Sequence, residues 1–135
     1  MIASYRDLEV WRKGMDLATE TYRLARQLPK AEEYRLTSQL LRAAASVPAN
    51  IAEGHTRATR KEYAQFVSIA RGSLAETETF LMLASRAGLL QEAQVAPALA
   101  LAEALGRQLT VLRQRVTAPP QPPIPNPENP CGEAA

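Results

Sequence analysis

Apolar side chains recur every three or four residues over four long stretches of the chain. In residues 7–28 they are Leu8, Trp11, Met15, Ala18, Tyr22 and Ala25. This spacing places them on one face of an α-helix that packs lengthwise against its neighbours. Because the residue before a proline disfavours the helical conformation, the first helix is expected to end ahead of Pro29.

The second stretch, from Glu32 to Glu53, contains a proline within its apolar pattern. The pattern consists of Leu36, Leu40, Ala43, Val47 and Ile51, and it continues past Pro48. A proline removes one backbone donor and crowds the preceding turn, so we expect the helix to be kinked at Pro48 but not to end there. Gly54 is expected to end it.

The third and fourth stretches complete the predicted fold. Thr59 and Glu62 have the spacing of a capping box, which starts a helix. Its apolar face consists of Tyr63, Phe66, Val67, Ala70, Leu74, Thr77, Leu81 and Ala84. The fourth helix, from about Gln91 to Thr117, carries Val95, Ala98, Ala102, Leu105, Leu109, Leu112 and Val116. Without a strand pattern, the fold class is all-α, an antiparallel up-and-down four-helix bundle.

Composition divides the chain into a folded domain and a tail. Seven of the ten prolines lie between Ala118 and Cys131. Such a run favours extended polyproline conformation over helix or strand. We therefore expect residues 1–118 to form the bundle and residues 119–135 to be a proline-rich, disordered tail. Alternatively, "PPQPPIP" docks in the aromatic groove of a protein partner.

The net charge and the single cysteine limit the classes of binding partner and the cellular compartment that we expect for this chain. The tail holds Glu128 and Glu133 but no Lys or Arg, so residues 1–118 carry 16 basic and 12 acidic residues, or +4. This mild excess permits contact with a polyanion without requiring it. Cys131 is the only cysteine, which fits a reducing compartment. We find neither a signal-peptide pattern nor an apolar stretch of membrane-spanning length, so we expect a cytoplasmic protein without a membrane partner.

Two helices carry more apolar residues than one face requires. The additional residues are Val10, Leu17 and Leu24 on the first helix, and Ile69, Phe80 and Leu83 on the third. Contiguous exposed apolar surface usually marks an interface, so these six residues predict a homo-oligomer. The alternative is a broad core-facing arc in a monomer.

The sequence does not contain the converging groups of an active site. His55 is the only histidine, so it offers neither the Glu-x-x-His pairs of a di-iron bundle nor a recognisable triad. The segments "EGH" and "RGS" do not match a phosphate-binding loop. Glu20, Glu53, Glu76 and Glu103 are expected to be solvated or ion-paired. We therefore predict no enzyme activity, no cofactor and no metal site.

The strongest candidate for a binding site is the basic segment between the second and third helices. His55, Arg57, Arg60 and Lys61 bracket the expected start of the third helix. Backbone donors and basic side chains there could hold phosphate. The alternative is that these are ordinary solvated loop residues. In a cyclic oligomer such loops repeat, and weak contacts add through effective concentration.

Long segments of the chain resemble one known family. "YRDLEVWRKGMDLATETY" and "LRAAASVPANIAEGHTRATRKEYAQFVSIARGSLAETET", together with the helical remainder, resemble the four helix bundle protein family over about residues 4–115. These proteins are also called intervening-sequence proteins, because some are encoded within insertions in bacterial large-subunit ribosomal RNA genes. The combination of "SVPANIAEG" and "ARGSLAE" at this separation is quite specific.

The resemblance implies an antiparallel four-helix bundle assembled as a homopentamer, without an established enzymatic activity. Relatives include the accessory protein of diversity-generating retroelements, a basic pentamer that binds a reverse transcriptase and nucleic acid. The expected function is therefore a non-catalytic homopentamer that binds RNA or DNA through repeated basic loops. The alternative is a protein–protein adaptor or scaffold that does not bind nucleic acid.

The two motifs also predict an architectural joint between the second and third helices. Their positions in this chain are Pro48, Asn50, Ile51, Ala52, Glu53 and Gly54, then Arg71, Gly72, Ser73, Leu74 and Glu76. Asn50 is expected to hydrogen-bond backbone groups freed at Pro48. Glu53 is expected to pair with Arg71, while Gly72 and Ser73 let the helices approach closely. The joint would secondarily aim the basic loop.

Overall fold

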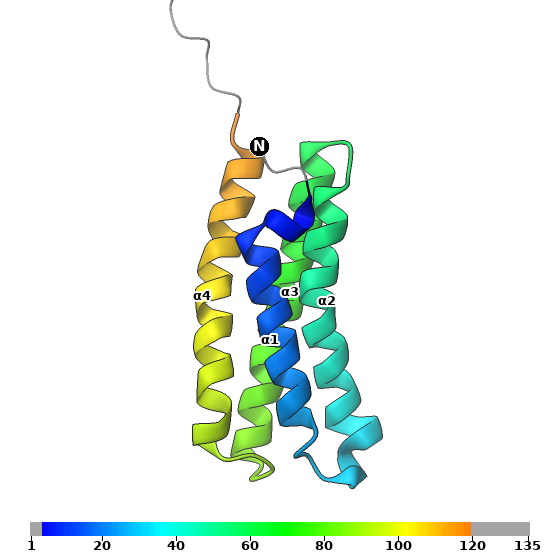
Figure 1. Cartoon of the computed structure of the whole chain (residues 1–135), viewed down its shortest axis with the longest axis vertical. Helices are drawn as coiled ribbons and strands as arrows, with labels where there is room; N and C mark the ends of the chain where they lie inside the picture. Colours follow the sequence, from blue (N-terminus) through cyan, green and yellow to red (C-terminus); the bar gives the residue numbers. More distant parts are fainter. Residues whose placement is uncertain (1–3, 120–135) are drawn as a thin grey trace, which may run out of the picture.

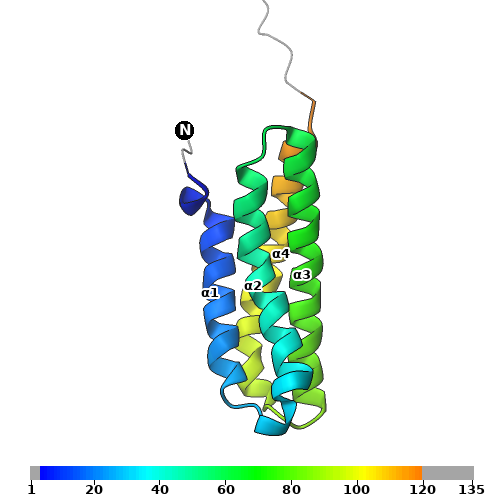
Figure 2. The same ribbon diagram turned by 90° about the vertical axis from the view of Figure 1, so that its right-hand side faces the viewer.

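The computed structural model describes residues 4–119, which form four long helices running alternately up and down (Figure 1). The helices are α1 (Glu9–Ala25), α2 (Ser38–His55), α3 (Arg60–Arg86) and α4 (Glu92–Thr117), with a 3-10 helix at Tyr5–Asp7. Each long helix contacts the next, and α4 returns to α1. Figure 2 shows α1 and α3 on opposite sides of the bundle. The predicted four-helix bundle is confirmed, and the predicted disordered tail lies outside the described residues apart from Pro119.

The link between α1 and α2 is irregular. Lys30–Glu32 forms a 3-10 helix and Glu33–Thr37 a π-helix. Within the second segment Arg35 leaves the helical region, with φ −115 and ψ −106. The helix predicted from Glu32 therefore becomes a regular α-helix only at Ser38, because the backbone at Arg35 interrupts it.

The predicted buried faces of α2, α3 and α4 are largely confirmed. Side chains with no more than 1% exposure include Leu40, Val47, Ile51, Val67, Ala70, Leu81, Val95, Ala98, Ala102, Leu105 and Leu109. Burying one large aliphatic side chain contributes about 1.5–3 kcal/mol, so this shared core is the main force holding the helices together.

The buried face of α1 differs from the predicted one. Leu17 is fully buried, and Val10 and Leu24 are also in the core. Met15 and Tyr22, which were expected to face the core, are 42% and 46% exposed. The expectation that Val10, Leu17 and Leu24 form an exposed interface is therefore wrong.

Two buried positions of α1 are occupied by Gly14 and Thr21, which a pattern of apolar residues does not include. A Cβ built on Gly14 would lie 3.4 Å from Cβ of Pro48, so α1 and α2 pack closely there. Thr21 is fully buried, and its hydroxyl donates to the carbonyl oxygen of Leu17 at 2.7 Å. Because this hydrogen bond satisfies the hydroxyl, the polar side chain is tolerated in the core.

Helix α2 continues through Pro48, as its periodicity predicted, and ends at His55. The bend expected at Pro48 stays a prediction. Gly54 does not end the helix; it is buried in the last turn. A Cβ there would lie 2.7 Å from Cβ of Phe66 on α3, closer than two such atoms can approach. Gly54 is therefore required for the packing of α2 on α3.

The two motif segments meet in a side-chain network between α2 and α3. The Asn50 amide donates to the carbonyl oxygen of Ser46 at 2.7 Å and to its hydroxyl oxygen at 2.8 Å. The hydroxyl of Ser73 on α3 donates to the same Ser46 hydroxyl oxygen at 2.9 Å. Proline has no backbone N–H, so the carbonyl that Pro48 leaves without a helical donor is that of Ala44, one turn earlier. Asn50 binds the carbonyl of Ser46, which also lies near Pro48.

Two further expectations for the motif residues are wrong. Glu53 forms an ion pair with Arg57, with 2.7 Å between Oε1 and Nη2, and not with Arg71. Gly72 is exposed, and a Cβ there would meet no atom within 4 Å. Gly72 therefore faces outward, whereas Ser73 is buried against α2, and the two helices also pack closely at Gly54.

Helix α4 is long and apolar enough to cross a membrane, judged by length and composition alone. The sequence was expected to contain no such stretch. However, Val95, Ala98, Ala102, Leu105 and Leu109 of this helix are buried in the bundle. A core helix passes the same test, so the finding does not distinguish a membrane helix from a core helix.

Candidate nucleic-acid interface

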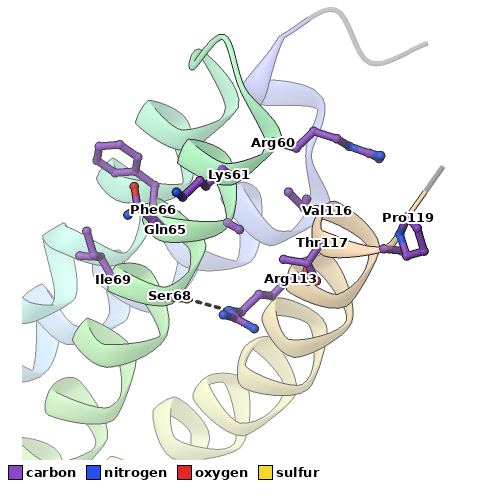
Figure 3. Close-up of a pocket in the computed structure, with 12 residues that line it drawn as sticks. Arg60, Lys61, Gln65, Phe66, Ser68, Ile69, Arg113, Val116, Thr117 and Pro119 are labelled. Carbon is purple, nitrogen blue, oxygen red and sulfur yellow. Dashed lines mark hydrogen bonds between the residues drawn. The ribbon is translucent and has the colours of Figure 1, made fainter.

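An open hollow of about 890 Å³ lies between the start of α3 and the end of α4 (Figure 3). Its basic side chains are Arg60 and Lys61 from α3 and Arg113 from α4. Ile69 and Val116 contribute apolar surface. Among the described residues, none of those lining the hollow is acidic.

The start of α3 contributes two successive basic residues to the lining of the hollow. Thr59 caps the helix, and its hydroxyl oxygen accepts from the backbone N–H of Glu62 at 3.1 Å. This is one half of the predicted capping box. Arg60 and Lys61 then occupy the first helical positions, where backbone N–H groups lack helical acceptors and the helix dipole favours an anion.

Arg113 is held against α3 by a hydrogen bond from its Nε to the hydroxyl oxygen of Ser68 at 2.7 Å (Figure 3). A guanidinium has five N–H donors, so this bond fixes the side chain while other donors remain to bind a ligand. Sequence reasoning missed Arg113, which lies 52 positions from Lys61. An antiparallel bundle places the end of α4 beside the start of α3, and that topology could have identified it.

The four predicted binding residues divide into two groups. Arg60 and Lys61 line the hollow. His55 and Arg57, at the end of α2 and in the following loop, do not. The four residues therefore do not line one common surface, and the hollow is built by α3 and α4 together.

His55 and Arg57 make contacts within the protein. Besides its ion pair with Glu53, the Arg57 guanidinium lies 4.7 Å from the centroid of the Phe66 ring. The His55 ring meets the Tyr63 ring edge-on, with 5.9 Å between centroids. These cation–π and aromatic contacts join the α2–α3 loop to α3.

The excess positive charge of the bundle is concentrated at this same end. Residues 4–13, 53–62 and 107–117, where α1 and α3 begin and α2 and α4 end, carry nine Lys or Arg and four Asp or Glu, a net +5. The rest of residues 1–118 carries seven basic and eight acidic residues, a net −1. A phosphate backbone would therefore be attracted to one end of the molecule.

Two side chains with shifted pKa values lie outside the hollow. Burial raises the pKa of the Tyr63 phenol. Burial, with a smaller effect from the carboxylate of Glu103, raises the pKa of Glu78. Within residues 4–119, no cluster of three His, Cys, Asp or Glu side chains is placed to hold a metal ion. The hollow thus offers basic side chains and apolar surface, which suit the binding of an anionic ligand.

The chain matches the model of the 23S rRNA-intervening sequence protein family over residues 6–111. It belongs to this family. This confirms the resemblance carried by "SVPANIAEG" and "ARGSLAE", which both lie within the matched range. Arg113 lies just beyond that range, so the family match does not bear on its role.

The fold is also found among solved structures. One of these is the crystal structure of a protein with unknown function from the S23 ribosomal protein family of Bacteroides thetaiotaomicron. The TM-score is 0.73 and the sequences are 24% identical, over 78% of this chain and 98% of that chain. At this identity the similarity shows the fold alone. The search of curated proteins gave no match.

Proposed function

We propose that this chain is a non-catalytic protein that binds the phosphate backbone of RNA or DNA at the basic end of its helical bundle. The observation that carries the proposal is the distribution of charge, +5 at that end against −1 in the rest of residues 1–118. The hollow between α3 and α4 lies at that end and supplies its binding groups, Arg60, Lys61 and Arg113.

The three cations are suited to phosphate in different ways. A guanidinium binds phosphate with two parallel hydrogen bonds, whereas an ammonium acts as a compact point charge. The N-terminus of α3 adds backbone donors beside Arg60 and Lys61. These contacts position a nucleic acid but do not read its bases, so the expected binding is weakly dependent on sequence.

The proposal is tested by fluorescence anisotropy of the protein with a structured RNA and with duplex DNA across a salt series. Three phosphate contacts give a log–log slope of about −2 to −3 per site, because each contact releases condensed counterions. Binding that weakens steeply with salt is the expected result. Absence of binding at low salt would contradict the proposal and favour a protein adaptor.

The proposal also includes a homo-oligomer, with the pentamer of the family resemblance as the expected assembly. Ile69 and Leu83 on the outer face of α3 are each 50% exposed, whereas Phe80 is partly buried against the core. An odd ring needs contacts between two different patches. We propose as the second patch a hollow of about 580 Å³ between α1 and α4, where Val111 is exposed beside Glu9, Lys13, Arg107 and Arg115.

Introducing charge on this face of α3 should dissociate the oligomer. In the variant Leu83→Glu, which leaves the hollow with Arg60, Lys61 and Arg113 untouched, a carboxylate must be desolvated at the contact, so the mass from light scattering should fall to that of a monomer. Met15→Glu, on the exposed face of α1, is the matched control and should leave the mass unchanged. If the α3 variant keeps its assembly, α3 is not the interface.

A further inference from the structure

A second apolar hollow, of about 490 Å³, follows the seam between α1 and α2. Tyr5, Trp11 and Tyr22 contribute aromatic rings, and Pro48 lies on the α2 side with three alanines. Tyr5 and Trp11 meet edge-on, with ring centroids 5.3 Å apart. No charged side chain is among the described residues that line this groove, which we call the aromatic groove.

This combination of rings, small residues and no charge is suited to a polyproline segment. Proline rings pack between aromatic side chains, and the preformed polyproline helix loses little entropy on binding. Trp11 and Tyr22 are eleven residues apart on α1, or about 16 Å along the helix axis. A polyproline helix covers that distance with about five residues.

We propose that the aromatic groove binds this chain's own proline-rich segment, residues 119–130. That segment, "PPQPPIPNPENP", contains seven prolines and a single charged residue, Glu128. The groove carries no charge to oppose it, and its rings match the proline content. The composition of the groove and the composition of the segment thus both point to this occupant.

The position and length of the segment allow it to reach the groove. Pro119 follows the end of α4, at the same end of the bundle as Tyr5–Asp7 and the start of α1 (Figures 1 and 2). Twelve polyproline residues span about 37 Å. Neighbouring helix axes lie about 8–10 Å apart, so the segment can cross the end of the bundle and still lay several residues in the groove. Tethering also raises the effective concentration of a weakly binding segment.

Trp11 is the only tryptophan, so its fluorescence reports directly on the groove. The experiment compares the full-length protein with a full-length variant carrying Pro122→Ser, Pro123→Ser, Pro125→Ser and Pro127→Ser. Acrylamide quenching of Trp11 should increase about twofold in the variant, because the ring loses the segment that covers it. A synthetic peptide of residues 119–130 added to the variant should restore the protection.

Controls separate this result from misfolding and from self-association. The buried core lies between Leu8 and Val116, and all four proline substitutions lie beyond it. Circular dichroism should therefore report the same helical content for the wild type and the proline variant. Glu128→Gln should leave quenching unchanged, whereas Met15→Glu in the groove should raise it without altering the mass. Equal quenching of wild type and proline variant would overturn the proposal. If dilution removes the protection of Trp11 from acrylamide equally in wild type and in the proline variant, the groove binds a second copy of the chain. That result would also overturn the proposal.

Discussion

Replacing Arg60, Lys61 and Arg113 by glutamate should lower the affinity for RNA or DNA by about 100-fold near physiological salt, or more. The substitution removes three phosphate contacts and places three carboxylates where the backbone would lie. Anisotropy titrations of wild type and variant under the same conditions measure the loss. All three side chains lie on the surface, so the helical content should be unchanged.

A matched variant distinguishes the effect of the three side chains in the hollow from the effect of the change in net charge. Arg26, Lys30 and Arg86 lie at the opposite end of the bundle, and their replacement by glutamate changes the net charge by the same amount. This control should bind nearly as well as wild type, apart from a uniform long-range effect that salt screens. Equal losses in the two variants would show that binding does not depend on the hollow.

The same substitution at two glycines of the joint should have opposite effects on stability. Gly54→Ala should destabilise the fold by about 1–3 kcal/mol, because its Cβ would overlap Phe66 and force α2 and α3 apart. Gly72→Ala should stabilise it by up to about 1 kcal/mol, because alanine is the better helix former and its Cβ meets open space.

Urea unfolding followed by circular dichroism, at one protein concentration, measures both changes. A fixed concentration is necessary because self-association adds to apparent stability. Changes of the same sign at Gly54 and Gly72 would contradict the packing described for α2 and α3. A neutral Gly54→Ala would show that the two helices separate at little cost.

Spacing alone predicted most of the buried faces of α2 and α4, because all of their core positions except Gly54 are occupied by an apolar residue or alanine. The same reasoning selected the wrong face of α1. There Gly14 and Thr21 occupy core positions, while Met15 and Tyr22 are on the surface. A small residue opposite Pro48 and a hydroxyl bonded to its own helix are favourable only in the context of the neighbouring helices.

The candidate site was only partly predictable for a similar reason. Local sequence placed Arg60 and Lys61 at the start of α3, since a cap and its helix are adjacent in sequence. The contacts of Arg57 with Glu53 and Phe66 depend on how α2 packs against α3. Arg113 joins the site only because the antiparallel topology brings the end of α4 to the start of α3.

The salt dependence of binding, compared between wild type and the Arg60, Lys61 and Arg113 variant, tests the central claim most directly. If these side chains bind phosphate, the log–log slope should become shallower by about 2 to 3 for each site occupied, since about 0.7–0.9 counterions are released per contact. Equal slopes in the two proteins, or a wild-type affinity that does not change with salt, would contradict a phosphate-binding site at this end of the bundle.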